Sequence, residues 1–235
     1  RNLTTAEELQ NKMWQQARLI EFLNEMPIIQ LMLESVEADD LISYVVQDKN
    51  YKGWQKIIIS SDKDFFQLCD DETIIYRPIQ KKFVSRSTIL DEFEIHPNNF
   101  ALARAIAGDK SDNLEGIKGA GLKTIAKRFN FLREAKTYFT QDLIQACEKE
   151  EKKLKFHNNI LQNEELILDN YKLMQLYSPA ISPQGKMKIR YVLDNFIAEF
   201  NQTGVKAMMI NDGFGEWDCT ELFAFFKRIV INRNT

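Results

Sequence analysis

The stretch 105–129, AIAGDKSDNLEGIKGAGLKTIAKRF, indicates more about the fold than any other part of the chain. Its first half places two carboxylates three residues apart in a Gly-Asp-x-x-Asp-Asn loop, at Asp109 and Asp112. Its second half makes a glycine-rich turn, GIKGAG, and enters a basic amphipathic helix. Paired carboxylates suit a divalent metal ion, and the turn with its helix suits a phosphate backbone. Few functions need both in so short a stretch, and nucleases are foremost among them.

The second half of this stretch predicts a helix–hairpin–helix element. Its glycines permit positive φ angles and a close backbone approach to a phosphate, and its lysines can neutralise neighbouring phosphates. Such contacts position a nucleic acid without reading its bases. The alternative interpretation is an ordinary tight turn between two helices. The residues expected at the phosphates are Gly116, Lys118, Gly119, Gly121, Lys123, Thr124 and Lys127.

Two further acidic groups stand upstream, and each has an ordinary explanation when taken alone. Glu37, Asp39 and Asp40 fall at an expected helix start, where acids commonly cap. Asp62 and Asp64 follow a strand, where Asp-x-Asp often forms only a turn. Together with the pair at 109 and 112 they favour a shared cation, because clustered carboxylates repel one another. Oxygen ligands select a hard ion, so we expect Mg²⁺ or Mn²⁺.

Composition limits the other possibilities. The 235 residues carry a net charge of −3, with 44% apolar and 28% charged residues, as in an ordinary globular protein. No apolar run is long enough to span a bilayer, no secretory signal is evident, and three scattered cysteines make neither a disulfide framework nor a zinc pattern. Neither histidine neighbours an acidic group, which further discounts zinc. We therefore expect a cytoplasmic protein, in the host cytoplasm if the source is viral.

Alternating strand and helix patterns predict an α/β fold up to about residue 85, followed by a helical region. The run KIIIS is continuous in β-branched residues, as in a parallel sheet that is covered on both faces. Strands are expected at 28–33, 56–60, 73–76 and 82–84. Helices are expected at 5–26, 37–47, 64–69, 87–92, 98–107, 122–129, 132–139, 141–155, 191–200 and 219–230, with a loop at 178–185.

Three segments carry a resemblance to a known family. VEADD at 36–40, ISSDKDFFQL at 59–68 and AGDKSDNLEGIKGAGLKTIAKRF at 107–129 resemble, in order and spacing, the motifs of the 5′-nuclease family. That family includes flap endonucleases, bacteriophage 5′-3′ exonucleases, a bacteriophage ribonuclease H and the 5′-nuclease domain of bacterial DNA polymerase I. The small size and divergent tail are most similar to the phage members, including the ribonuclease H.

The resemblance implies a fold and a set of parts. It implies a PIN-like parallel-sheet nuclease domain, here in residues 1–86, then a helical DNA-binding region in 87–175 and a helical extension in 176–235. It implies a two-metal site, with K⁺ on carbonyls of the glycine turn. The residues implied to bind the metal ions and act in catalysis are Glu37, Asp39, Asp40, Asp62, Asp64, Asp109 and Asp112.

The resemblance also implies an activity and partners. The expected protein is a monomeric, structure-specific 5′ nuclease of DNA replication or repair. It would hydrolyse phosphodiester bonds and could remove RNA primers, as a ribonuclease H does. Its substrates would be DNA with a 5′ flap or 5′ end, or an RNA–DNA hybrid, and a sliding clamp, polymerase or single-strand-binding protein could recruit it. The family's first two carboxylates have no counterpart here, and the chain starts with Arg1. We therefore expect these residues alone to be inactive or weak.

Two other interpretations remain. A non-catalytic duplex-binding module would use only the hairpin, with the acids serving as caps. A metal-dependent RNase of the PIN type is a third class, although such RNases generally lack a helix–hairpin–helix element. Substitutions at Asp62 and Asp109 separate the first two interpretations, because they should abolish cleavage and spare duplex binding only in a nuclease.

Overall fold

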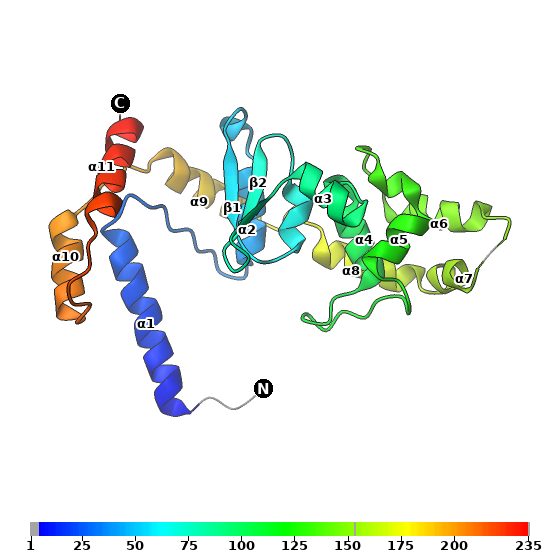
Figure 1. Cartoon of the computed structure of the whole chain (residues 1–235), viewed down its shortest axis with the longest axis horizontal. Helices are drawn as coiled ribbons and strands as arrows, with labels where there is room; N and C mark the ends of the chain where they lie inside the picture. Colours follow the sequence, from blue (N-terminus) through cyan, green and yellow to red (C-terminus); the bar gives the residue numbers. More distant parts are fainter. Residues whose placement is uncertain (1–4, 153, 235) are drawn as a thin grey trace. The chain divides into compact units, whose positions relative to one another are not determined.

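A computed structural model describes residues 5–152 and 154–234, which form two compact units. One unit is Glu34–Ile181, and the other combines the residues up to Leu33 with those from Ser182 onward. Figure 1 shows the elements of both. The divisions expected at 86 and at 175 fall inside Glu34–Ile181, and they stay a prediction about functional parts.

The larger unit begins with a small mixed sheet in the order β1-β2-β3. β1 (Lys56–Ile59) pairs in parallel with β2 (Thr73–Arg77), and β2 pairs in antiparallel with β3 (Lys82–Val84). Ile58 and Ile75 lie opposite each other and are buried, whereas Ile57 and Ile59 on the other face are 51% and 71% exposed. The α/β class is confirmed. The prediction that both faces of β1 are covered was wrong within the described residues, because only the face with Ile58 meets the core.

Helices complete this unit and supply most of its core. The elements around the sheet are α2 (Ala38–Val46), η1 (Lys49–Tyr51), η2 (Asp64–Leu68) and α3 (Arg86–Phe93). The helical region contains η3 (Pro97–Asn99), α4 (Phe100–Ala107), α5 (Leu122–Arg128), η4 (Asn130–Arg133), α6 (Thr140–Lys149), α7 (Lys155–Gln162) and α8 (Glu164–Met174).

An aromatic cluster joins η2, α3 and α4. The rings of Phe66 and Phe100 lie 5.3 Å apart, and Phe93 lies 6.0 Å and 5.4 Å from them. Tilted aromatic contacts at these separations add to the free energy of apolar burial. Every residue of α4 is buried except Arg104 and Ala107. The short helix η2, which starts at Asp64, is thereby fixed against α4.

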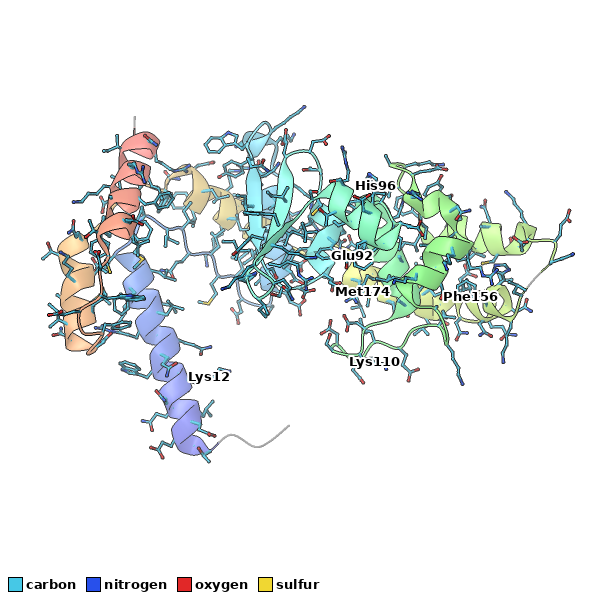
Figure 2. The ribbon with its side chains drawn as sticks, viewed as in Figure 1. Lys12, Glu92, His96, Lys110, Phe156 and Met174 are labelled. Carbon is cyan, nitrogen blue, oxygen red and sulfur yellow. The ribbon has the colours of Figure 1, made fainter. Side chains whose placement is uncertain are left out.

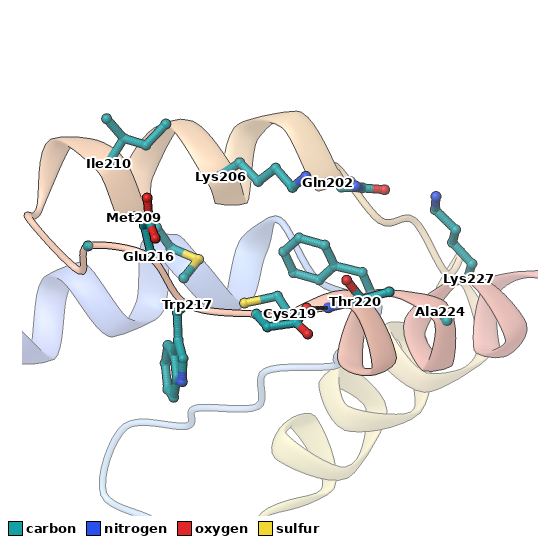
Figure 3. Close-up of a pocket in the computed structure, with 13 residues that line it drawn as sticks. Gln202, Lys206, Met209, Ile210, Glu216, Trp217, Cys219, Thr220, Ala224 and Lys227 are labelled. Atoms are coloured by element: carbon teal, nitrogen blue, oxygen red, sulfur yellow. Dashed lines mark hydrogen bonds between the residues drawn. The ribbon is translucent and has the colours of Figure 1, made fainter.

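The smaller unit is helical. α1 (Ala6–Asn24) starts with a capping box, in which Thr5 and Glu8 exchange hydrogen bonds, and none of its residues is buried. The other helices are α9 (Pro183–Asp194), α10 (Gln202–Asn211) and α11 (Thr220–Asn234). The guanidinium of Arg18 donates to Asp212 at 2.7 Å and thus ties α1 to the end of α10. A hollow of about 770 Å³ lies at α10 and α11, with Lys206 and Lys227 at its wall (Figure 3).

Several expected elements need correction. Residues 28–33 form no strand, although their exposure partly alternates. Residues 132–139 form no helix beyond the short η4, and 191–200 are helical only to Asp194. The helix expected at 141–155 is divided between α6 and α7. In the described parts of the chain, no helix has both the length and the apolar character that crossing a membrane would require.

Candidate metal centre and nucleic-acid interface

Asp64 is positioned by the turn that follows β1. The backbone N–H of Asp62 donates to Ser60 Oγ at 3.1 Å, and the N–H of Asp64 donates to Asp62 Oδ1 at 2.8 Å. These bonds wind the chain into η2 directly beyond the carboxyl end of the strand, where ligands bind in open α/β sheets. Asp62 stays exposed and acts on this turn, whereas the Asp64 side chain is 17% exposed.

Asp109 and Asp112 are held in a closed loop after α4. Gly108 ends the helix with a φ of 74°, and Asp109 and Leu114 then pair through two backbone hydrogen bonds of 2.9 Å and 2.7 Å. Asp109 Oδ1 accepts bonds from the N–H and the hydroxyl of Ser111, at 2.8 Å and 2.5 Å. Lys110 projects from the same loop in Figure 2. The carboxyl group of Asp109 therefore has a fixed orientation.

These two segments bring three carboxylates together. Oxygens of Asp64, Asp109 and Asp112 lie within 4.8 Å of one another. Asp64 and Asp109 are partly buried, and Asp112 is exposed. Carboxylate oxygens at this spacing, one of them open to solvent, form a donor set that suits a hard divalent ion.

A cation of the protein lies in the same group. Arg104 Nε donates to Asp64 Oδ1 at 3.0 Å, and its terminal nitrogen donates to Asp109 Oδ2. Sequence analysis did not identify Arg104, although a lone arginine in the apolar run FALARAIA, one turn before Gly108-Asp109, was a usable signal. It partly neutralises the acidic group.

The two buried carboxyl groups respond differently to this setting. Burial raises the pKa of Asp64, and the charge of Arg104 only partly offsets that effect. Burial would also raise the pKa of Asp109, but the hydrogen bonds from Ser111 and the guanidinium of Arg104 outweigh it and lower the pKa. Asp109 is thus an anion near neutral pH, as a metal ligand must be.

The acids of the expected helix start do not join this group. Glu37 precedes α2 without a side-chain capping bond, and Asp39 and Asp40 lie in its first turn. Burial raises the pKa of Asp40, which accepts a bond from the backbone of Ala180. Of the seven acids predicted as ligands, Asp64, Asp109 and Asp112 are the ones that the described structure gathers at short range.

The glycine turn has buried and exposed components. Ile117, Ala120, Ile125 and Ala126 are buried. Lys118, Lys123 and Lys127 are exposed, as are Gly119 and Gly121. Thr124 is half-buried and donates its backbone N–H to the carbonyl of Gly121 at 2.8 Å. A hollow of about 710 Å³ lies over this turn and is lined by residues 107–108, 110 and 113–121.

Gly116 has a different role from the other turn glycines. A Cβ on Gly116 would lie 2.5 Å from the nitrogen of Gly108 and closer still to the carbonyl of Ala107. The two backbones therefore touch, and the N–H of Ile117 donates to the carbonyl of Ile106 at 2.8 Å. Gly116 therefore lets the turn pack against the acidic loop, and this packing role does not depend on a bound phosphate.

A buried amide from α8 supports this contact. Asn170 Nδ2 donates to the carbonyls of Ala105 and Glu115, at 3.0 Å and 2.8 Å. Both α8 and the role of Asn170 escaped sequence analysis, because these partners are 65 and 55 residues away along the chain. No local pattern signals such a bond.

The N-terminal part of the chain is similar to known nucleases. Residues 4–95 match the family model of the 5′-3′ exonuclease, N-terminal resolvase-like domain. A 5′-3′ exonuclease of Aquifex aeolicus is 34% identical over 94 residues, which cover 40% of this chain and 32% of that protein. Part of the chain is thus similar to the 5′-3′ exonucleases. The resemblance stated above is confirmed at this level, and its narrower part, kinship to a phage ribonuclease H, stays a prediction.

Other relatives of the 5′-3′ exonucleases match the same part of the chain. A 5′-3′ exonuclease of Buchnera aphidicola (subsp. Schizaphis graminum) is 32% identical over 52% of this chain and 44% of that protein. The thermostable DNA polymerase I of Thermus aquaticus is 30% identical over 48% of this chain and 14% of that protein. The chain thus spans less than half the length of the two curated exonucleases that it matches.

Solved structures of these nucleases share the fold. The bacteriophage T5 D15 protein co-crystallised with metal ions has a TM-score of 0.62 and 21% identity, covering 88% of this chain and 72% of that one. The T5 5′-exonuclease with bound zinc has a TM-score of 0.60 and 22% identity over 89% and 71% of the two chains. The T5 D15 flap endonuclease in a complex with DNA and metal ions also scores 0.60, at 21% identity over 88% and 71%. The PIN-like α/β fold with a helical region is therefore confirmed.

Proposed function

We propose that the protein containing this chain is a divalent-metal-dependent 5′ nuclease, a flap endonuclease or 5′-3′ exonuclease that hydrolyses phosphodiester bonds. The observation that carries the proposal is the convergence of Asp64, Asp109 and Asp112 within 4.8 Å, from two segments about forty residues apart. The kinship to 5′-3′ exonucleases supports it. So does the adjoining glycine turn, whose lysines are exposed.

The residues divide into two groups by task. Asp64, Asp109 and Asp112 would hold Mg²⁺ or Mn²⁺, with Glu37, Asp39, Asp40 and Asp62 contributing to a second ion or to bound water. When bound, such ions activate a water molecule and stabilise the leaving oxygen of a phosphodiester. Asp109 is kept anionic and oriented by Ser111 and Arg104 before any ion arrives.

The second group grips the substrate. Lys118 lines the hollow over the glycine turn, and Lys123 and Lys127 are exposed on the helix that follows, so these lysines can neutralise phosphates of a duplex. The backbone at Gly119 and Gly121 is open there, because a Cβ at either residue would meet nothing within 4 Å. Carbonyls of this turn would also hold K⁺. Phosphate contacts of this kind predict binding without base preference.

Further parts of the proposal concern the setting. The substrates would be DNA with a 5′ flap or 5′ end, or an RNA–DNA hybrid. The protein would act as a monomer in the cytoplasm, with a replication clamp, polymerase or single-strand-binding protein as a partner. Residues 1–86 would serve the nuclease domain, 87–175 the DNA grip, and 176–235 an extension.

The decisive variant is Asp112→Asn. Asp112 is exposed, so the change removes one ligand charge at little cost to the fold. Mn²⁺ binding to the 235-residue chain should weaken at least tenfold, which corresponds to about 1.4 kcal/mol. Asp169→Asn is the matched control, because Asp169 pairs with Lys172 on the surface and lies outside the acidic group. Equal Mn²⁺ affinity in wild type, Asp112→Asn and Asp169→Asn would contradict the metal site.

Cleavage and grip are then tested separately. The full-length protein should cut a 5′-flap duplex with Mg²⁺, and Asp112→Asn should abolish cutting while sparing duplex binding. The 235 residues alone should cut weakly or not at all. Duplex binding that persists while no form of the protein cuts would favour the non-catalytic binding module.

A further inference from the structure

The position of Arg104 has a consequence for the proposed metal site. Its guanidinium lies between Asp64 and Asp109, and the three side chains are only 15%, 17% and 12% exposed. Arg104 stands in the last turn of α4, and its carbonyl accepts a 2.8 Å bond from Gly108, the first residue of the acidic loop. The contact therefore joins the η2 turn to that loop through one rigid helix end.

Hydrogen bonds already engage both oxygens of Asp109 and one oxygen of Asp64. Asp109 Oδ1 accepts two bonds from Ser111, and Asp109 Oδ2 accepts one from Arg104. Asp64 Oδ1 is bonded to Arg104 as well. The Ser111 bonds belong to the turn itself, whereas the arginine reaches Asp109 with a long side chain that has other rotamers. Arg104 is thus the partner that can yield an oxygen.

Charge leads to the same conclusion. Three carboxylates within 4.8 Å repel one another, and Arg104 supplies the single positive charge bonded to two of them. A divalent ion placed among the same oxygens would neutralise them better and would repel the guanidinium. The guanidinium and a divalent ion cannot both bind Asp109 Oδ2 without repelling each other.

We propose that Arg104 is a resident counter-ion of the metal site: it holds Asp64 and Asp109 together while the site lacks metal, and it releases Asp109 when a divalent ion binds. This inference rests on the proposed function. It makes Arg104 a positioning residue that stabilises the metal-free fold and lowers the affinity for metal. The alternative is an arginine that stays in place and merely orients the carboxylates.

Mn²⁺ titration of Arg104→Gln separates these two roles. The variant should have a lower melting temperature in EDTA and should bind Mn²⁺ about tenfold more tightly than wild type, because a like charge a few ångströms away is removed. Arg133→Gln is the control, since Arg133 forms an exposed pair with Glu94 and its loss removes the same charge elsewhere. It should change neither quantity.

The outcomes are distinguishable from those of the proposed function. If the wild type binds Mn²⁺ and Arg104→Gln binds it equally or more weakly, the counter-ion role alone is overturned. An absence of Mn²⁺ binding in both proteins would overturn the metal site together with it.

A measurement on the wild type covers the case in which Arg104→Gln does not fold. A terminal N–H of Arg104 donates to Asp109 Oδ2, so it should give an observable NMR signal in the metal-free protein, assigned by its loss in Arg104→Lys. Diamagnetic Mg²⁺ should shift or broaden that signal along with the amide of Ser111. A Ser111 amide that moves on Mg²⁺ addition while the Arg104 signal stays in place would refute the release.

Discussion

Gly116→Ala should destabilise the larger unit by about 2–4 kcal/mol. The added Cβ would overlap the carbonyl of Ala107 and lie 2.5 Å from the nitrogen of Gly108, whereas real Cβ atoms keep at least 3.0 Å, so the two backbones must separate by more than 0.5 Å. Overpacking of this size costs about 1–3 kcal/mol. The separation also strains the 2.8 Å bond from Ile117 to Ile106, which adds about 1 kcal/mol.

Two neighbouring glycines provide matched controls in urea unfolding. At Gly121 a Cβ meets nothing and φ is −73°, so Gly121→Ala should change the free energy of unfolding by less than about 0.5 kcal/mol. At Gly119 the space is open but φ is +83°, so Gly119→Ala should cost about 1 kcal/mol of backbone strain. If Gly116→Ala proved as stable as Gly121→Ala, the close contact between the turn and the acidic loop would be refuted.

Three further predictions test other parts of the argument. Asn99 is fully buried and makes four hydrogen bonds, so Asn99→Ala should lower the free energy of unfolding by about 3 kcal/mol or more, against less than about 1 kcal/mol for the exposed neighbour Asn98→Ala; equal losses would speak against the buried hub. Burial, with the charge of Arg86, lowers the pKa of His96 from 6.5, so the imidazole binds a proton more readily in the unfolded chain, and the free energy of unfolding should fall as pH drops through about 6.5. His96→Asn should flatten this dependence of the unfolding free energy on pH. A dependence that the substitution leaves unchanged would contradict the role of His96. Lys123→Ala should weaken duplex binding alike for all sequences and reduce the slope of log K against log salt by about 0.9, and a sequence-dependent loss would contradict a backbone grip.

Local patterns predicted the elements whose signals are local. The strand KIII, the hairpin strands β2 and β3, and the basic helix α5 all occur where the sequence indicated them. Ser85 caps α3, one residue before the first residue of the helix. The same patterns overstated the cover of β1, because a β-branched run indicates a strand but does not specify what packs on each face.

Long-range bonds account for the main errors. The helix expected at 132–139 is prevented by Asn99, whose amide takes the carbonyls of Leu132, Glu134 and Lys136 more than thirty residues away. These carbonyls would otherwise bond along a helix. Asn170 similarly fixes the acidic loop from a helix that no motif signalled. Such partners are chosen by the tertiary fold, so a single sequence does not reveal them.

The candidate site divides in the same way. Residue types and spacing were sufficient to select Asp64, Asp109 and Asp112 as members of one group. They did not indicate that Asp62 accepts a bond from the backbone N–H of Asp64, and they did not identify Arg104. Position relative to a strand end predicts a place for chemistry, but the bond that each side chain actually makes depends on its neighbours in space.

Repulsion among the three carboxylates must be balanced by packing elsewhere. Asp64 begins η2 and Asp109 follows α4, and the rings of Phe66 in η2 and Phe100 at the start of α4 pack against each other. A bound ion and this aromatic contact would therefore favour the same arrangement of η2 and α4. A ligand that binds only the folded state stabilises that state by RT ln(1 + [L]/Kd), which is about 2.7 kcal/mol at a hundredfold excess over Kd. Bound metal would therefore offset the repulsion among the three carboxylates, which core packing balances in its absence. Metal binding at the acidic site and folding of the core that positions it are therefore coupled.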